Sequence, residues 1–224
     1  GAARGGALSD PTLLEELGGA AVIRTRAALL PTWLPWRVRN TLSRWLFITD
    51  DQAGWGPFAL AAATRLIRRG DIDALYSTST PYTAHLVGLR LKQRFGLPWI
   101  ADFRDPWAEN TALKPPTAWH RQRIRRWEAQ VVRAADRVTV VSEPMAASLR
   151  ATYPALPPAH FLTLPNGYDP EDFAQAAPAA VEDPPRMTWV YSGSFYGERR
   201  AQPFLHALHA ALVAERIPRA QVRV

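Results

Sequence analysis

The sequence predicts an α/β fold, in which a doubly wound parallel sheet carries helices on both faces. Two observations support this fold class. Short β-rich runs alternate with longer helical patterns through the middle of the chain. Hydrophobic residues make up 47% of the sequence, enough for a packed core. Strands that alternate with helices of ten or more residues are typical of a parallel sheet.

The first expected elements are a strand, a helix and a second strand. Residues 20–25 are largely apolar and include three β-branched residues, which favours a strand. Residues 57–69 are rich in Ala and Leu and are followed by Gly70, which favours a helix with a glycine stop. Residues 73–77 contain the short apolar stretch Ala-Leu-Tyr and run into a Ser-Thr-Ser-Thr-Pro segment, and we expect a buried strand there.

The central elements continue the alternation. Residues 82–95 predict a helix that ends at Gly96, because glycine readily adopts the left-handed conformation that closes helices. Residues 98–103 then predict a strand, and residues 119–134 a long helix. Residues 137–141 are an unbroken β-branched run and predict the next strand.

The last elements of this region are a helix and a strand. Ser142 precedes Glu-Pro, a combination that favours a helix start, and this helix is expected to run to about residue 152. Residues 160–164 predict one more strand, which ends at Pro-Asn-Gly.

A break in composition divides the chain into two domains. Residues 174–185 are rich in Ala and Pro and are interpreted as a linker. We therefore expect a first domain over residues 1–173 and the start of a second α/β domain over residues 186–224. In the second domain, residues 187–192 predict a strand and residues 200–215 a helix.

Composition and charge exclude several classes of protein. The chain has no Cys, so disulfide frameworks, thiolate metal sites and Cys nucleophiles are excluded. No apolar run approaches the roughly 18 residues of a membrane span. The five His residues form no His-Glu-x-x-His pattern, and no metal site is predicted.

The excess of 27 Lys+Arg over 20 Asp+Glu gathers in two clusters of Arg and Trp. One interpretation is an anionic membrane surface, since indole lies at the headgroup level and guanidinium pairs with phosphate. The alternative is an ordinary helix whose Trp packs inward and whose Arg is solvated. The first cluster holds Arg24, Arg26, Arg37, Arg39 and Arg44 with Trp33, Trp36 and Trp45, and the second Arg121, Arg123, Arg125, Arg126 and Arg133 with Trp119 and Trp127.

Charged side chains follow directly after the predicted strand at residues 98–103. Ligands of doubly wound sheets bind beyond the carboxyl ends of the strands, so this position is a candidate site. Asp102 and Asp105 flank Arg104, which should keep both carboxylates ionised and suited to hydrogen bonding or to the role of a base. A structural ion-pair network is the alternative.

Hydroxyl groups and a Gly-rich turn mark two further candidate sites. Ser77, Thr78 and Ser79 precede a helix and could bind an anion or a sugar, or could cap that helix. In the second domain, the candidates lie between a strand and a helix, where glycine permits close approach and Arg attracts a diphosphate. These candidates are Gly193, Ser194, Arg199 and Arg200.

Five motifs in order resemble glycosyltransferase family 4, whose members have the two-domain, Rossmann-like GT-B fold. The motifs are DALYSTSTP at residues 73–81, PWIADFRDPW at 98–107, ADRVTVVS at 135–142, LPNGYD at 164–169 and YSGSFYG at 191–197. The resemblance covers most of the chain from about residue 55 onward.

The resemblance implies retaining transfer of a sugar from a nucleotide-sugar donor, without a metal or other cofactor. It places Asp102, Arg104 and Asp105 in a catalytic loop on the acceptor side. By the same resemblance Asn166 and Gly167 bind substrate near the interdomain cleft, although Asn-Gly by itself only indicates a turn. The loop from Gly193 to Arg200 would contact the donor diphosphate.

The sequence departs from the family pattern at three places. Many relatives place a His near residues 102–105, and this sequence has none there. The first strand with its Gly-rich loop would precede Gly1, and the Glu-x7-Glu pattern would follow Val224. We therefore expect the chain to be truncated at both ends, and the 224-residue chain alone to be inactive or nearly so.

The expected partners are a nucleotide-sugar donor and a glycan or lipid-linked acceptor of cell-surface biosynthesis. The enzyme would be a hexosyltransferase-type protein in the cytoplasm, at the inner face of the membrane. Two alternatives stay open. One is a nucleotide-sugar epimerase of the same architecture. The other is a non-catalytic module in which the Arg/Trp clusters bind a membrane or nucleic acid, although no nucleic-acid-binding module is recognised and none is predicted as a partner.

Overall fold

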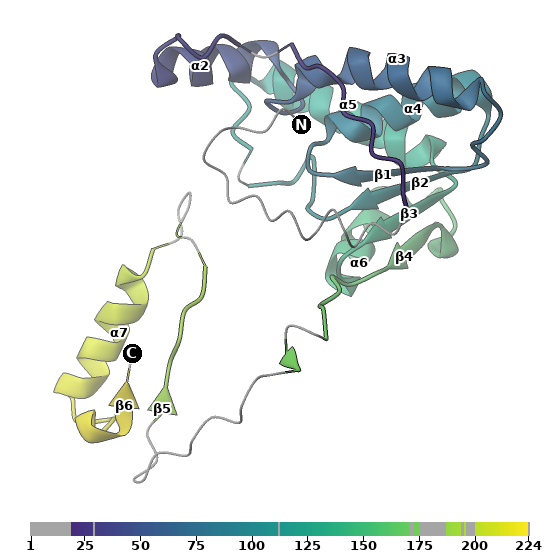
Figure 1. The fold of residues 1–224 in the computed structure, drawn as a ribbon. Coiled ribbons are helices and arrows are strands. Elements are labelled where there is room, and N and C mark those ends of the chain that lie inside the picture. Colours follow the sequence, from purple (N-terminus) through teal and green to yellow (C-terminus); the bar gives the residue numbers. More distant parts are fainter. Residues whose placement is uncertain are drawn as a thin grey trace. The chain divides into compact units, whose positions relative to one another are not determined.

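The computed structural model describes residues 19–28, 30–111, 113–170, 173–174, 187–193, 195 and 200–223. The chain divides into two compact units, residues 1–166 and 167–224 (Figure 1). Nearly all of the predicted linker at residues 174–185 lies outside the described residues, so the linker and its bounds stay predictions.

The first unit contains a four-stranded parallel sheet in the order β1-β2-β3-β4. The strands are β1 (Leu75–Ser79), β2 (Trp99–Phe103), β3 (Arg137–Val140) and β4 (Phe161–Thr163). Each strand pairs with the next one along the chain, which confirms the predicted α/β class with a Rossmann-like parallel sheet.

Three helices connect these strands. They are α4 (Thr83–Phe95), α5 (Ala118–Ala134) and α6 (Glu143–Thr152), and a short 3-10 turn, η2 (Pro158–His160), precedes β4. Gly96 has φ +70 and closes α4, as predicted, because this conformation carries little penalty for glycine. Ser142 occupies the N-cap position of α6, but its side chain makes no capping hydrogen bond.

All three connecting helices contribute to one core on one face of the sheet. Each connection between parallel strands is right-handed and leads to the next strand on the same side of the previous one. Helices in such connections all lie on one face of the sheet. Trp99, Ala101, Phe103, Val138 and Val140 project from that face and are fully buried.

The opposite face of the sheet is largely open to solvent within the described residues. Tyr76, Ile100 and Leu162 project from it and are 58%, 38% and 46% exposed. The same face carries a row of polar residues, Thr78, Asp102 and Thr139, which are paired neighbours on β1, β2 and β3. The described helices therefore cover one face of the sheet, whereas a doubly wound sheet carries helices on both.

The segment before β1 differs in part from the prediction. It contains α2 (Trp36–Leu46), a 3-10 turn η1 (Ala53–Trp55) and α3 (Gly56–Ile67). The predicted helix at residues 57–69 corresponds to α3 and is confirmed. No helix bounds were predicted at the position of α2, where a helix was only the alternative interpretation of the first Arg/Trp cluster.

The predicted strand at residues 20–25 is wrong. This stretch pairs with no strand in the described structure, and Val22 and Ile23 are more than half exposed. A β-branched run becomes a strand only where a neighbour completes its ladder. The chain instead passes close to η1, where Ala28 N–H donates to the Gly54 carbonyl at 3.0 Å. A Cβ at Gly54 would lie 1.8 Å from the Ala28 carbonyl oxygen, so this approach requires glycine.

The second unit is a small α/β arrangement. Its two parallel strands are β5 (Met187–Thr188) and β6 (Val222–Arg223), and α7 (Gln202–Val213) and a 3-10 turn η4 (Arg219–Gln221) lie between them in sequence. The predicted strand and helix are both present, but β5 ends four residues earlier than predicted.

Candidate functional site

Asp102 lies near the carboxyl end of β2, at the centre of a polar cluster built by strand register. Thr78 on β1 and Thr139 on β3 are its direct neighbours. Their hydroxyl groups donate to the carboxylate at 2.8 and 2.7 Å. Although the side chain projects from the open face, it is only 1% exposed. The two threonines therefore fix the carboxylate in one orientation.

This environment keeps Asp102 ionised. Burial raises its pKa, but hydrogen bonds from Thr139, Thr78 and Tyr76, together with the charge of Arg104, outweigh burial and lower the pKa below its usual value. The Arg104 guanidinium lies 3.7 Å from the carboxylate. Asp102 is thus a fixed negative charge, suited to hold a cation.

Arg104 connects the ends of two strands. Its side chain is 41% exposed, and it donates a hydrogen bond to the side-chain oxygen of Asn166, which follows β4. The structure therefore brings together Asp102, Arg104 and Asn166 of the predicted site residues. Asp105 follows as an exposed residue. Gly167 is exposed and begins the second unit.

The three predicted hydroxyl residues lie on different faces of β1. Ser77 is buried, and its hydroxyl accepts from Trp99 Nε1 at 2.9 Å and lies 2.9 Å from His85 Nδ1. Ser79 is also buried, and its hydroxyl donates to the Asp102 carbonyl at 3.5 Å. Of the three, Thr78 lies on the open face with the Asp102 carboxylate.

Asp50 binds the start of α4 and was not predicted as a site residue. Its carboxylate accepts from the Thr83 backbone N–H at 2.7 Å and from the Thr83 hydroxyl at 3.0 Å. The helix dipole favours a carboxylate at this end. Burial raises the pKa of Asp50 despite these bonds. The segment before α3 is thereby attached to the carboxyl edge of the sheet, a contact that no local sequence pattern indicates.

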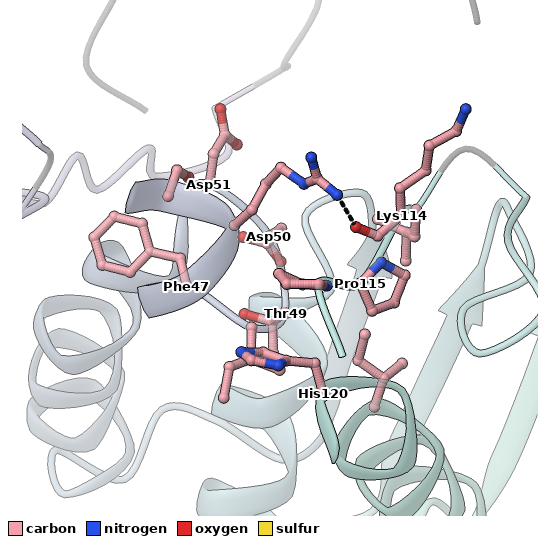
Figure 2. A pocket seen from close by; sticks show the side chains of 13 residues that line it. Phe47, Thr49, Asp50, Asp51, Lys114, Pro115 and His120 are labelled. Atoms are coloured by element: carbon pink, nitrogen blue, oxygen red, sulfur yellow. Dashed lines mark hydrogen bonds between the residues drawn. The ribbon is translucent and has the colours of Figure 1, made fainter. Parts of the chain in front are cut away.

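A pocket of about 430 Å³ opens at the same edge, between the segment after α2 and the loop after β2 (Figure 2). This volume falls within the range of small-molecule sites. Arg44 donates to the Lys114 carbonyl at 2.5 Å across the pocket. Hydroxyl, carboxylate, imidazole and cationic groups line it together with apolar side chains, so it suits a polyhydroxylated ligand. The lining residues are Ser43, Arg44, Phe47, Ile48, Thr49, Asp50, Asp51, Leu113, Lys114, Pro115, Pro116, His120 and Ile124.

Glu128 on α5 holds the loop that follows β2. Its carboxylate accepts from the Ala108 backbone N–H at 2.7 Å and from the Tyr153 hydroxyl at 2.8 Å. Burial raises the pKa of Glu128 in spite of these two bonds. The loop that carries Arg104 and Asp105 is thus bonded to α5, and the same carboxylate bonds Tyr153 at the end of α6.

The predicted diphosphate residues belong to the second unit. Gly193 has φ +146, a conformation that favours glycine, and Arg200 is exposed. Ser194 and Arg199 lie outside the described residues, so their placement stays a prediction.

Two structural features of the described residues bear on other kinds of site. They contain no group of three His, Asp or Glu side chains placed to hold a metal ion. Among the same residues, no helix has the length and apolar character needed to cross a membrane. The prediction that no metal is used stays a prediction.

Comparison with known proteins gives one family. Residues 17–172, more than two thirds of the chain, match the model described as Glycosyltransferase Family 4. This range contains the sheet, the Asp102–Arg104 cluster and the pocket. No curated protein matches the chain.

Proposed function

Since the chain belongs to glycosyltransferase family 4, we propose that it serves retaining transfer of a sugar from a nucleotide-sugar donor to a glycan or lipid-linked acceptor. Family membership itself supports a transferase that uses a sugar donor and an acceptor. The hexosyl group, the retaining course and the pathway in cell-surface glycan synthesis are parts of the proposal.

The proposal rests on the position of Arg104. This exposed cation is held at the carboxyl edge of the sheet by Asp102 and Asn166. Fixed cations at such an edge stabilise negative charge that develops during transfer, because they need no reorganisation. In this proposal Arg104 contacts the substrate, and Asp102 holds Arg104 in position. Asp105, exposed on the same loop, would accept a hydrogen bond from the acceptor hydroxyl.

The acceptor would enter the pocket beside the loop after β2. Thr49, Asp50 and His120 offer hydroxyl, carboxylate and imidazole groups there, as Figure 2 shows. Sugars present several hydroxyl groups that both donate and accept, so a mixed lining of this kind recognises them better than a purely cationic one.

The donor diphosphate would be bound by the loop of the second unit. Glycine at residue 193 permits close approach of the backbone, and Arg199 and Arg200 would neutralise the leaving diphosphate without a metal. The two Arg/Trp clusters support a location at an anionic membrane surface on the cytoplasmic side, where a lipid-linked acceptor would be met.

The test is product analysis with the natural protein that carries this chain. Nucleotide sugars are incubated with and without lipid-linked acceptors, and free nucleoside diphosphate and glycosylated product are measured. Acceptor-dependent release of nucleoside diphosphate, with the anomeric configuration of the donor kept, is the expected result. Interconversion of the donor sugar without product would instead establish the epimerase and overturn the proposal.

A further inference from the structure

The fold brings Trp45 of the first Arg/Trp cluster and Trp119 of the second, about 75 residues apart in sequence, into contact with the same side chain. His120, in the first turn of α5, lies between the two tryptophans Trp45 and Trp119. Its ring meets both indole rings edge-on. The ring centroids are 5.4 Å apart for Trp45 and 5.0 Å apart for Trp119. His120 Nε2 also lies 3.4 Å from the Trp45 carbonyl oxygen. We call α2 together with Trp119 the Trp45–Trp119 surface; His120, which both tryptophans contact, is itself buried.

Large apolar side chains on this surface face solvent instead of the core. Trp36, Trp45 and Trp119 are 67%, 53% and 59% exposed. The alternative of an ordinary surface helix requires its tryptophans to pack inward. These three tryptophans do not pack inward. Trp127 of the second cluster is partly buried and packs against the core, so it is not part of the surface.

The helix α2 has one apolar side. Val38, Leu42, Trp45 and Leu46 follow the i, i+4, i+7, i+8 spacing that places side chains on one face of a helix. All four are exposed, Leu42 by 37% and Leu46 by 61%. An exposed apolar face on an amphipathic helix normally marks a surface that is covered by a partner.

The exposed charges carried by α2 and α5 themselves are of one sign. The helix α2 carries Arg37, Arg39 and Arg44 and no acid. The sole acid of α5 is Glu128, which is buried and bonded to Ala108 and Tyr153. The exposed charges of both helices are therefore all positive, which is complementary to an anionic partner.

We propose that the Trp45–Trp119 surface docks on an anionic lipid bilayer, with α2 lying in the interface. A helix with an apolar face, flanking Arg and exposed Trp is suited to this location. Nucleic acid would account for the Arg residues, but it offers nothing to cover the apolar side of α2.

This inference deepens the proposed function and rests on it, because it identifies how a membrane-linked acceptor reaches the site. Arg44 of α2 lines the pocket in Figure 2, and so does the buried His120, which contacts Trp45 and Trp119. The pocket therefore opens beside the docking surface. The acceptor would be lipid-linked, with its sugar head in the pocket and its tail in the bilayer.

Vesicle sedimentation of the natural protein tests the inference. Vesicles of phosphatidylcholine alone are compared with vesicles that also contain phosphatidylglycerol, and duplex DNA is added as a competitor at matched salt. We expect sedimentation with the anionic vesicles. W45E and W119E should each require roughly tenfold more lipid. R37Q should weaken binding to anionic vesicles about fivefold, since each Arg near the surface contributes about 1 kcal/mol.

V213E is the matched control, because Val213 is an exposed apolar residue of another helix, α7, and is 69% exposed. It should bind as the unaltered protein does. Far-UV circular dichroism checks that each variant is folded. Equal binding by W45E, W119E and the unaltered protein would overturn the inference. Binding to neutral vesicles as strong as binding to anionic vesicles would also overturn it. Release of the protein from anionic vesicles by duplex DNA would overturn it as well.

Transfer to a water-soluble acceptor and to a detergent-solubilised lipid-linked acceptor is measured in parallel, so that the two proposals fail separately. Transfer that persists in a protein without vesicle binding would overturn the docking surface and leave the transferase standing. Vesicle binding that depends on Trp45, in a protein without transfer, would support the surface and overturn the proposed function.

Discussion

His85 and Asp102 are buried titratable side chains that respond to burial in opposite ways. His85 is fully buried, stacks on Phe103 with ring centroids 4.4 Å apart, and lies 2.9 Å from the Ser77 hydroxyl. Burial lowers the pKa of His85 to about 4, so the imidazole is neutral in the folded protein. Asp102 has three hydroxyl donors and a guanidinium nearby, which keep it charged.

His85 should make stability depend on pH in a defined window. Its pKa is about 4 in the folded protein and about 6.5 when unfolded, so the unfolded chain binds more protons between these values. The stabilisation is fully present above pH 6.5 and is lost as the pH falls toward 4. We expect the free energy of unfolding to drop by about 3 kcal/mol across this window.

Denaturant unfolding of the unaltered chain and of H85Q at pH 7 and pH 4.5 checks this expectation. The difference between the two proteins isolates His85 from the other titrating groups. H206Q, which alters an exposed His on α7, should keep the full pH dependence. If the free energy of unfolding fell by the same amount between pH 7 and pH 4.5 in H85Q and in the unaltered chain, His85 would not be the cause of the pH dependence.

At the scale of elements, α4 lies against β2 through a glycine. Trp99 is fully buried, and its indole nitrogen donates to Ser77. A Cβ at Gly88 would lie 2.7 Å from the Trp99 ring, closer than side chains are found. The missing side chain therefore sets how closely the helix approaches the sheet.

G88A should destabilise the first unit by about 1–3 kcal/mol, because the extra methyl overpacks a filled core. This outcome reverses the usual benefit of replacing a helical glycine by alanine. Equilibrium unfolding measures it, with R90A on the exposed side of the same helix as a control of small effect. If G88A were as stable as the unaltered chain, the close packing described here would be wrong.

Most elements of the first unit could be predicted from sequence, since local signals mark them. Gly96 ends α4 in a left-handed conformation, and the β-branched run at β3 becomes a buried strand. The errors lie where structure depends on distant partners. Residues 20–25 have strand composition but no described strand beside them. The helix α2 could be predicted only as an alternative without bounds, because its apolar side faces solvent and its Arg and Trp residues resemble a binding cluster.

At the scale of the whole molecule, parallel topology explains why the site could be predicted in part. Residues that follow different strands meet at one edge, which brings Arg104 to Asn166 across 62 positions. Other contacts have no such rule behind them. Sequence does not indicate that Asp50 binds the start of α4, or that Trp45 and Trp119 share His120.

The central claim is that this family 4 chain transfers a sugar with Arg104 at the reaction site. Its most direct test is the kcat/KM of sugar transfer by the natural protein carrying R104Q. The matched control is R90Q, which removes an exposed Arg of α4 away from the site. We predict a loss of roughly 100-fold for R104Q, the size expected when one preorganised donor is removed, and no loss for R90Q. Transfer by a folded R104Q protein at the unaltered rate would contradict the account.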